Sequence, residues 1–570
     1  MSMSSSREPW GPSHEYLPPP GRRRGHWKLG AIALILVALE LLGYRADHPD
    51  AQNALTWTLH TLALNSAILA LLFLLVRAAM TGRLRLPVPQ AQSPATRLAD
   101  QIAGAENPGE AVRAHSRELG GGAFLGFSPG GRWVTANPEH AVMLLGPPRS
   151  GKTTSVVIPS LLAAPGAALS TSTKRDVIDA TWRARSQLGQ VWLFDPSGEQ
   201  THWPQGIRKL CWSPVAAATT WDQALLMARA MSATSPATHG TRNEHHWTER
   251  SAALLAPLLY AANLTNQPIA TVLRWVLRGE LNPAGKALEN NDAQVAGDVL
   301  IGIAHTDERE RSSIFSATAG ILAAYNADTT RRAAAKPNFD AERFAASTDT
   351  VYITAPAHKQ NLAAPLVVGL LEQIRHATYQ HATHHQPTGP PVFFCLDEIA
   401  NIAPIHDLPA LISEAGGQHL HILACLQDLS QARTRWGQDA ADGFLSLFQT
   451  KLILTGIADS RTLEAISLAL GEYDRHLVSH TISQSTPDKP RTPHTHTDSV
   501  TYNTQRQRTL NPGDIARLPP GHGLLLHGTH WGLLKLTPWQ RTRPWTAVTK
   551  AEVLAGTPNH SQGDALAARA

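Results

Sequence analysis

Residues 146–153 have the residue types and spacing of a phosphate-binding loop. They read Gly-Pro-Pro-Arg-Ser-Gly-Lys-Thr, which fits the pattern Gly-x(4)-Gly-Lys-[Ser/Thr]. An apolar run over 141–145 ends at this loop and a helix-compatible run begins at Lys152, which is the context that the motif requires. In such a loop backbone amides surround phosphate oxygens, the lysine neutralises them, and the Thr153 hydroxyl ligates Mg²⁺. The sequence therefore predicts a site for ATP and Mg²⁺ built from Gly146, Pro147, Pro148, Arg149, Ser150, Gly151, Lys152, Thr153 and Thr154.

Two carboxylates follow a second apolar run, over 392–396. At a strand tip, Asp397 suits the magnesium side of a nucleotide site and Glu398 suits orientation or deprotonation of the attacking water. The next apolar run, over 420–426, ends at Gln427, which can contact the γ-phosphate. The alternative for Gln427 is a loop amide in a turn hydrogen bond. Together with the loop, these residues predict nucleotide hydrolysis with Lys152, Glu398 and Gln427 as catalytic residues.

Pro159 lies about two turns into the helix expected after the loop. A proline there removes a hydrogen bond and clashes with the preceding turn, at a cost of ~3 kcal/mol or more unless the helix bends. We therefore predict a kinked or short helix.

The positioning elements are apolar runs that alternate with helical stretches. This alternation predicts an α/β fold with a parallel sheet covered on both faces. A hairpin over 124–127 and 132–135 precedes the first of these runs. The expected strands are 141–145, 191–194, 350–354, 392–396, 420–426 and 451–455, and two expected helices are 363–374 and 461–470.

Helical periodicity dominates residues 216–345, which we interpret as an all-helical domain inserted into the sheet domain. Its clearest pieces are 221–231, 247–264, 269–277 and 312–325. The region 81–120, rich in Ala, Gln, Pro, Ser and Gly, is expected to be a linker, and the polar region 474–508 a flexible excursion. The nucleotide-binding domain would then comprise 121–215 and 346–545, with 546–570 as a carboxy-terminal tail.

Two apolar runs near the amino terminus predict a transmembrane hairpin over 28–80, with spans 29–45 and 54–77. The second span is long enough to cross a bilayer, whereas the first is marginal and could also be a signal peptide or a buried helix. Arginines flank the pair on both sides, which predicts that the tail over 1–27, the other terminus and the ATPase domain are cytosolic. We expect a two-pass protein of the bacterial cytoplasmic (inner) membrane.

Charge and cysteine usage narrow the possible functions. Of the formal net charge of +5, residues 1–85 carry nine Lys/Arg against five Asp/Glu, and the remaining residues are nearly neutral. Bulk charge is therefore no evidence for nucleic-acid binding. The three cysteines, Cys211, Cys395 and Cys425, are far apart, which favours free thiols in a reducing compartment over a disulfide or zinc framework.

Several stretches resemble the coupling-protein ATPases of type IV secretion and bacterial conjugation (the TraG/TraD type). They are GPPRSGKTTSVVIPSLL, VWLFDPSG, VYITAP, LDEIANIAPIHDLPALISEAG and CLQDLSQARTRWG, beginning at residues 146, 191, 351, 396 and 425. The resemblance covers about residues 25–545 and includes the order of the parts. It implies a RecA-like P-loop ATPase core with an inserted all-α domain, assembled as a homo-hexamer at the membrane. It also implies that the partners are a relaxase (relaxosome) with single-stranded DNA or protein effectors, and the components of the secretion channel.

The sequence departs from the family pattern at two places. Many members have an arginine between the Asp-Glu strand and the glutamine strand, which could reach the neighbouring subunit's nucleotide, but here Gly416 and Gly417 stand there. Either another residue serves as the trans arginine, with Arg433 and Arg435 as the nearest candidates, or hydrolysis is slow. In the second place, Ser172 stands where the family often has an acid, which leaves the role of Lys174 open.

Three functions are compatible with these features. The first is a coupling-protein motor that recruits relaxase–DNA or protein substrates and drives their transfer. The second is a membrane-docked substrate receptor whose nucleotide site is a switch with little turnover, as the missing arginine would suggest. An FtsK-like double-stranded DNA pump is the third, although residues 546–570 are too short for the winged-helix DNA reader that such pumps usually have.

Overall fold

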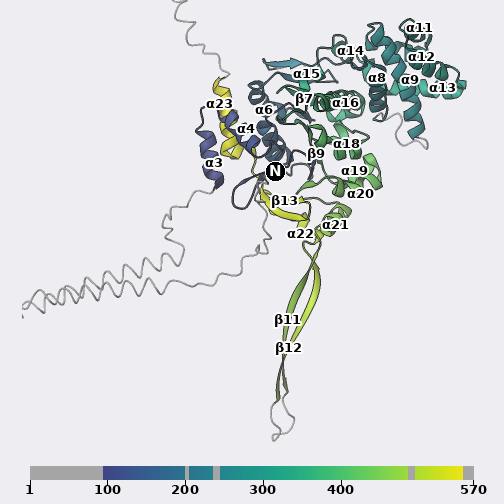
Figure 1. Cartoon of the computed structure of the whole chain (residues 1–570). Coiled ribbons are helices and arrows are strands. Elements are labelled where there is room, and N and C mark those ends of the chain that lie inside the picture. Colours follow the sequence, from purple (N-terminus) through teal and green to yellow (C-terminus); the bar gives the residue numbers. More distant parts are fainter. Residues whose placement is uncertain (1–93, 199–203, 235–243, 486–494, 556–570) are drawn as a thin grey trace, which may run out of the picture. The chain divides into compact units, whose positions relative to one another are not determined.

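The computed structural model describes residues 94–198, 204–234, 244–485 and 495–555 (Figure 1). The predicted tail over 1–27 and both predicted membrane spans lie outside these ranges. Within them, no helix is both long enough and apolar enough to cross a bilayer.

A twelve-stranded sheet forms the centre of the described chain. Eight of its strands are parallel neighbours, in the order β10-β3-β9-β8-β4-β7-β5-β6. In chain order they are β3 (Val142–Leu145), β4 (Ala168–Ser172), β5 (Val191–Phe194), β6 (Ile207–Lys209), β7 (Thr350–Thr354), β8 (Val392–Leu396), β9 (Leu420–Leu426) and β10 (Thr450–Leu454). All six predicted strands are present, and β4 and β6 are additional.

Four antiparallel strands extend the sheet beyond β10, in the order β13, β14, β1, β2. The hairpin β1 (Phe124–Phe127) and β2 (Trp133–Thr135) was expected from the sequence, whereas β13 (His522–His527) and β14 (His530–Lys535) were not. Since β13 pairs with β10, the carboxy-terminal part of the chain returns to the strand beside the phosphate-binding loop.

Both faces of the parallel sheet are buried. Along β3, Met143 and Leu145 belong to one apolar core, and Val142 and Leu144 belong to the other. Successive side chains of a strand point to opposite faces, so continuous apolar runs such as β3 require cover on both sides. The predicted doubly covered α/β sheet is confirmed.

The chain between β6 and β7, so far as it is described, forms only helices. They are α7 (Pro214–Ala217), α8 (Trp221–Ser232), α9 (Glu244–Leu264), α10 (Ile269–Arg278), α11 (Asn282–Glu289), α12 (Gln294–Ala304), α13 (Glu308–Ile321), α14 (Asp328–Ala334) and α15 (Ala341–Ala345). The helix α8 packs against α16 (Gln360–His385), which covers the sheet. The helical insertion and the ATPase core therefore share buried surface.

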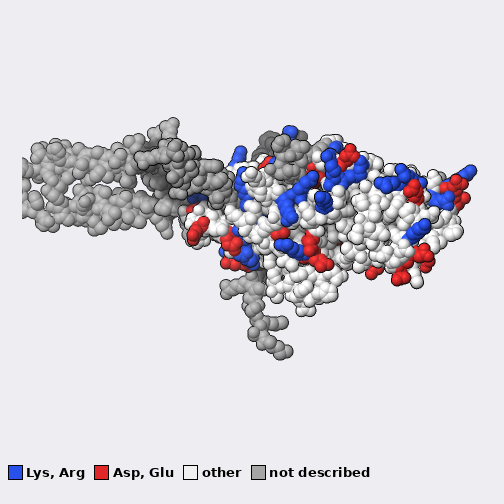
Figure 2. All heavy atoms as spheres, turned by 90° about the horizontal axis from the view of Figure 1, so that it is seen from above, with Lys and Arg blue, Asp and Glu red and all other residues white. Residues whose placement is uncertain are grey.

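Over the face shown in Figure 2, Lys and Arg side chains lie among Asp and Glu side chains, so the face carries charges of both signs.

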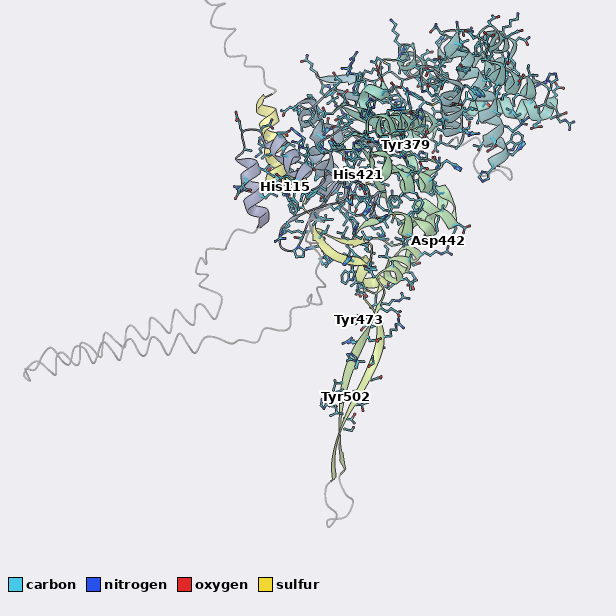
Figure 3. All side chains as sticks on the ribbon, in the orientation of Figure 1. His115, Tyr379, His421, Asp442, Tyr473 and Tyr502 are labelled. Carbon is cyan, nitrogen blue, oxygen red and sulfur yellow. The ribbon has the colours of Figure 1, made fainter. Side chains whose placement is uncertain are left out.

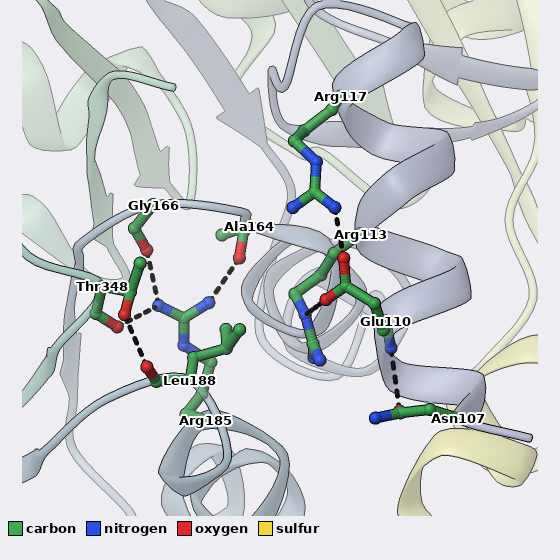
Figure 4. Close-up of polar contacts among 9 residues, drawn as sticks. All are labelled: Asn107, Glu110, Arg113, Arg117, Ala164, Gly166, Arg185, Leu188 and Thr348. Carbon is green, nitrogen blue, oxygen red and sulfur yellow. Dashed lines mark hydrogen bonds and ion pairs between the residues drawn. The ribbon is translucent and has the colours of Figure 1, made fainter. Parts of the chain in front are cut away.

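The expected linker over 81–120 contains two helices, α3 (Pro94–Ala103) and α4 (Pro108–Glu118). The prolines that suggested a linker stand at the first helical positions, where proline is favourable. Asn107 caps α4 by accepting a hydrogen bond from the Glu110 amide at 3.0 Å, and Glu110 pairs with Arg113 and Arg117 (Figure 4).

The expected carboxy-terminal tail begins inside a further helix, α23 (Arg543–Ala555). This helix packs against α3, α4 and α6 (Asp176–Ser186). Its Trp545 is fully buried and lies 4.9 Å from Trp133, measured between ring centroids. The two ends of the described chain are therefore joined by apolar packing.

Residues 474–508, expected to be a flexible excursion, lie largely in a two-stranded antiparallel ribbon of β11 (Glu472–Ser485) and β12 (Thr495–Arg508). Their Thr, Val, Ile and Tyr side chains favour strands, and the polar composition had obscured that preference.

Arg185 connects three segments at the amino ends of the parallel strands (Figure 4). Its guanidinium is fully buried and donates to the carbonyls of Ala164, Gly166 and Thr348 and to the Thr350 hydroxyl. Burial lowers the pKa of Arg185 to about 10, which still leaves it protonated at neutral pH. These bonds fix the edge of the sheet opposite the phosphate-binding loop.

Candidate active site

The phosphate-binding loop starts where β3 ends and turns tightly. A Cβ atom at Gly146 would lie 2.6 Å from the Ser150 hydroxyl oxygen and 3.0 Å from Cβ of Leu454, so only glycine fits. The backbone is left-handed at Arg149 (φ 65°) and Gly151 (φ 97°). Successive left- and right-handed residues turn backbone amides toward one point, which is how such loops hold phosphates.

Two side chains of the loop fit an anionic ligand. Lys152 Nζ folds back onto the loop and donates to the carbonyls of Gly146 and Pro147, the second at 3.1 Å. The Ser150 hydroxyl is buried without a hydrogen-bond partner in the described chain. Buried polar groups normally have partners. An ammonium held only by neutral carbonyls and an orphaned hydroxyl are consistent with a phosphate as the missing partner.

The helix after the loop is short, as Pro159 predicted. Residues Thr153–Val157 form a π-helical turn (η1), in which the Ile158 amide bonds to the Thr153 carbonyl. The α-helix α5 (Ile158–Ala163) then begins with the proline at its first turn. The wider turn places Pro159 where its missing amide and fixed φ are tolerated.

The Thr153 hydroxyl donates a hydrogen bond to the Asp397 carboxylate at 3.0 Å. Asp397 directly follows β8, and the Thr171 hydroxyl of the adjacent strand β4 bonds to the Asp397 carbonyl at 2.9 Å. The two residues assigned to magnesium therefore meet at the carboxyl edge of the sheet. Oxygen ligands of this kind are those that Mg²⁺ prefers.

Burial raises the pKa of Asp397 to about 6, against the lowering effects of the Thr153 hydrogen bond and the nearby Lys152 charge. Glu398 adds to the rise, as does Asp176 at the start of α6. A bound cation would offset the cost of holding this carboxylate buried and ionised.

Glu398 lies in the left-handed region (φ 54°) and is half-buried. Its carboxylate forms no hydrogen bond or ion pair within the part of the chain that the structure describes. A non-glycine residue in this conformation is strained and is found more often at functional sites. Glu398 is therefore available to an exogenous group such as water.

Gln427 follows β9, the strand between β3 and β8. The Gly146 amide bonds to the Leu426 carbonyl at 3.1 Å, so the end of β9 is tied to the loop. The Gln427 backbone N–H donates a hydrogen bond to the side-chain oxygen of Gln431 in α19 (Leu429–Trp436) at 2.9 Å. The topology thus places Gln427 between the phosphate-binding loop and the Asp-Glu pair.

Neither predicted trans arginine is free in this structure. Arg433 forms an ion pair with Asp459, with only 15% and 21% of the two side chains exposed. The Arg435 guanidinium donates to the Thr234 carbonyl at the end of α8 at 3.5 Å. Both arginines are engaged within their own chain, and a trans role would require these contacts to break.

The two glycines in place of the family's arginine differ in their surroundings. A Cβ atom at Gly416 would lie 2.0 Å from the Glu139 carbonyl oxygen, so no side chain fits. At Gly417 a Cβ atom meets nothing within 4 Å. Both lie before β9, whose seven residues place them about 23 Å from the carboxyl edge of the sheet. A side chain at 417 is therefore too far away to reach the nucleotide site of its own chain.

The segment after β4 contributes Asp176 to the site, a residue that the sequence had not indicated. The Ser172 hydroxyl accepts a hydrogen bond from the Lys174 amide at 3.2 Å, so this serine closes the turn that leads to Asp176. Asp176 is near enough to raise the pKa of Asp397. Recognising β4 as a strand would have indicated Asp176, because the residues after a parallel strand lie at the same edge of the sheet as those after its neighbours.

All three cysteines are free thiols, as predicted. Cys395 and Cys425 are fully buried on the neighbouring strands β8 and β9, and Cys211 is partly exposed. Burial raises the pKa of both buried thiols well above the usual value. They are core residues rather than reactive groups.

Comparison with known proteins identifies relatives of this chain. Protein VirD4 of Rhizobium rhizogenes is 24% identical over 378 residues, which cover 62% of this chain and 53% of that protein. Conjugal transfer protein TraG of Escherichia coli is 25% identical over 328 residues, covering 52% and 49%. The chain spans about half the length of these curated relatives.

Solved structures of the conjugative coupling protein TrwB share the fold. The unbound form has a TM-score of 0.54 at 15% identity and covers 74% of this chain and 91% of that one. The complex with ADP and Mg²⁺ has a TM-score of 0.53 at 15% identity, covering 75% and 91%. This likeness supports a RecA-like α/β fold. A family model described as type IV secretory system conjugative DNA transfer matches residues 100–530, and the chain belongs to that family.

Proposed function

We propose that this chain is an ATP hydrolase that drives DNA or protein substrates through a type IV secretion channel. The observation that carries the proposal is the 3.0 Å hydrogen bond between Thr153 and Asp397, which joins the phosphate-binding loop to the Asp-Glu strand. A TrwB structure in complex with the ATP analogue ADPNP supports nucleotide binding, and the complex with ADP and Mg²⁺ supports the metal.

Each site residue has a role that follows from its position. Lys152 would exchange its two carbonyl partners for phosphate oxygens. Thr153 and Asp397 would hold Mg²⁺, which when bound neutralises charge on the phosphates. Glu398, which has no partner of its own among the described residues, would orient the attacking water and accept its proton. Gln427 would contact the γ-phosphate from between them.

We propose that the protein is anchored by spans 29–45 and 54–77 in the bacterial cytoplasmic membrane, with both termini in the cytosol. The arginines flanking the two apolar runs support this orientation. Family membership supports a relaxase carrying single-stranded DNA, or protein effectors, as cargo, and the secretion channel as the destination. A homo-hexamer is the assembly that we infer for the motor.

ATP turnover by the full-length chain in lipid nanodiscs tests the proposal, with and without single-stranded DNA. Lys152→Ala should abolish phosphate release, because the ammonium that neutralises the phosphates is gone. Lys336→Ala, an exposed lysine in the helical insertion, is the matched control and should leave the rate unchanged. If no Lys152-dependent hydrolysis occurs under any condition, the motor proposal is wrong.

A receptor whose nucleotide site acts as a switch is a second candidate. It is favoured by the steric exclusion of any side chain at Gly416 and by the engagement of Arg433 within its own chain. In that case Lys152-dependent nucleotide binding would be measurable without turnover. Equilibrium binding of a fluorescent ATP analogue alongside the turnover assay distinguishes the two functions.

A further inference from the structure

The ribbon of β11 and β12 extends without packing along any other described element (Figure 1). Its strands pair from Glu472–Arg508 to Ser485–Thr495, fourteen residues each, or about 45 Å. Nearly all described side chains beyond its base are exposed. An isolated two-stranded ribbon is at best marginally stable in water, so this one needs a partner.

Its two faces differ in chemistry. On one face Val478 lies opposite Tyr502 and Val500 opposite His480, and the side chains of Val478, Val500 and Tyr502 are 52%, 42% and 80% exposed. Figure 3 shows Tyr502 on the ribbon. The other face carries the half-buried Leu477 opposite Asn503, and beyond them the small hydroxyl side chains of Ser479, Thr481, Ser499 and Thr501. The ribbon is thus amphipathic, and it cannot cover its own apolar face.

The middle of the ribbon lacks the positive charge that a nucleic-acid partner requires. Among residues 476–481 and 499–504 there is no Asp, Glu, Lys or Arg. Binding to a phosphate backbone depends on cations, so this stretch lacks the required groups. A protein surface is the partner that this uncharged, partly apolar middle stretch of the ribbon fits.

The two edges of the ribbon are open and suited to strand pairing. Long edge strands are normally protected by charges or prolines, which are absent from residues 476–481 and 499–504. At the base, β11 carries Glu472 and Asp474 and β12 carries Arg506 and Arg508. Arg506 pairs with Glu472 of the same ribbon at 3.0 Å, with 76% and 40% of the two side chains exposed, and Arg508 pairs with Glu464 of α21 (Ser460–Ala469) at 2.7 Å. These edges are complementary to each other, whereas β11 beside a second β11 would place acids against acids.

We propose that the ribbon is a self-assembly arm in which β11 of one copy pairs with β12 of the next copy. The pairing is antiparallel, with all ribbons pointing the same way, so that the acidic base of β11 meets the basic base of β12. The same operation repeated around a rotation axis closes a ring. Neighbouring patches of Val478, Val500 and Tyr502 then become continuous. This assembly does not depend on ATP binding or turnover.

Charge reversal tests the pairing on the full chain in detergent. The Glu472→Lys/Asp474→Lys variant has two basic edges, and Arg506→Glu/Arg508→Glu has two acidic edges. Alone, each variant should weaken self-association at least tenfold in sedimentation velocity, because like charges meet. Mixed in equal amounts, the variants should assemble again, since basic and acidic edges alternate. The ion pair between β11 and β12 of the same ribbon is lost in both variants and mixing cannot restore it. Any recovery on mixing must therefore come from contacts between different copies. Unchanged assembly of either variant, or no rescue on mixing, would overturn the proposal.

Crosslinking tests the choice of edges. In a Cys211→Ala background, one tagged chain carries Ser479→Cys and a differently tagged chain carries Thr501→Cys. A short bismaleimide should join mainly unlike tags, since β11 pairs with β12 of another copy. Ser186→Cys, at an exposed position in α6, replaces Ser479→Cys in the control for random collisions. Products that join like tags equally well, or no products above the control, contradict the proposed pairing.

Discussion

The Thr153 hydroxyl donates a hydrogen bond to the Asp397 carboxylate although the two residues are 244 positions apart in the chain. The contact arises because β3 and β8 are parallel strands of one sheet, separated only by β9. Their carboxyl ends therefore share an edge, where ligands of open α/β sheets bind. The order of the strands in the sheet is therefore what brings the two expected Mg²⁺ ligands into contact.

Replacing Thr153 with Ala should lower the rate constant of ATP hydrolysis about 100-fold or more, in the range seen when one preorganised contact at a reacting centre is lost. Thr153→Ser keeps the hydroxyl and should retain most of the activity. Phosphate release by both variants, titrated with Mg²⁺, checks this prediction. Equal rates for the Ala and Ser variants would show that the hydroxyl has no role at the metal.

Asp397→Asn should remove activity but increase stability at pH 8. The pKa of Asp397 is about 6 in the folded protein against 3.8 ordinarily, so the folded state binds this proton more tightly. Stability from this group is thus complete below pH ~4 and is lost as the pH rises through about 6, by about 3 kcal/mol. Asn carries no charge and should avoid this loss.

Urea denaturation between pH 4.5 and 8, without Mg²⁺ or nucleotide, measures the effect of Asp397→Asn. Asp459→Asn is the matched control with the opposite sign. Burial raises the pKa of Asp459, but the bonds from Thr462 and Arg433 outweigh it and lower the pKa, so this variant should lose stability at pH 8. A less stable Asp397→Asn variant at pH 8 would contradict the assignment of Asp397 as a strained, buried charge.

Gly416 and Gly417 should respond differently to substitution. Gly416→Ala should destabilise the fold by about 1–3 kcal/mol, because its Cβ atom meets the Glu139 backbone. Gly417→Arg has open space and should fold normally. If the site lacks only a trans arginine, this variant should raise turnover tenfold or more. Thermal melts and phosphate release check both substitutions, and unchanged turnover of the folded Gly417→Arg variant would exclude position 417 as the missing contact.

The sequence was sufficient to predict the elements whose chemistry follows from local pattern. Apolar runs such as 392–396 are strands because they need burial on both faces, and the loop motif carries its own conformational requirements. Strand β4 reads Ala-Leu-Ser-Thr-Ser and was missed, although every residue in it is buried. Its Thr171 hydroxyl is satisfied by the Asp397 carbonyl, a contact that no local pattern reveals.

Predictions that rested on composition were the ones that the structure corrected. Pro94 and Pro108 suggested a linker but begin helices, which pack against α23 near the other end of the described chain. The polar ribbon was not expected either, because its hydropathy is that of a loop. Whether Gly416 could accept a side chain was a separate question, and the answer depends on Glu139, which is distant in sequence. Long-range packing decided the cases of the two helices and of Gly416, whereas the ribbon follows the local strand preference of its side chains.

Arg433→Ala should destabilise the protein without removing a trans contact. The Arg433–Asp459 pair is largely buried, and loss of a charged hydrogen bond costs about 1.5–3 kcal/mol. Because the pKa of Asp459 is lowered, its stabilising effect exists above pH ~4 and is lost as the pH falls further, so the cost of Arg433→Ala should shrink in acid. Arg433→Ala should keep its turnover per folded chain, and mixing it with Lys152→Ala chains should not raise turnover above that of the Arg433→Ala chains alone. If mixing does restore turnover, an Arg433 side chain from one copy completes the site of another, and the intramolecular pair is a resting arrangement that opens on assembly.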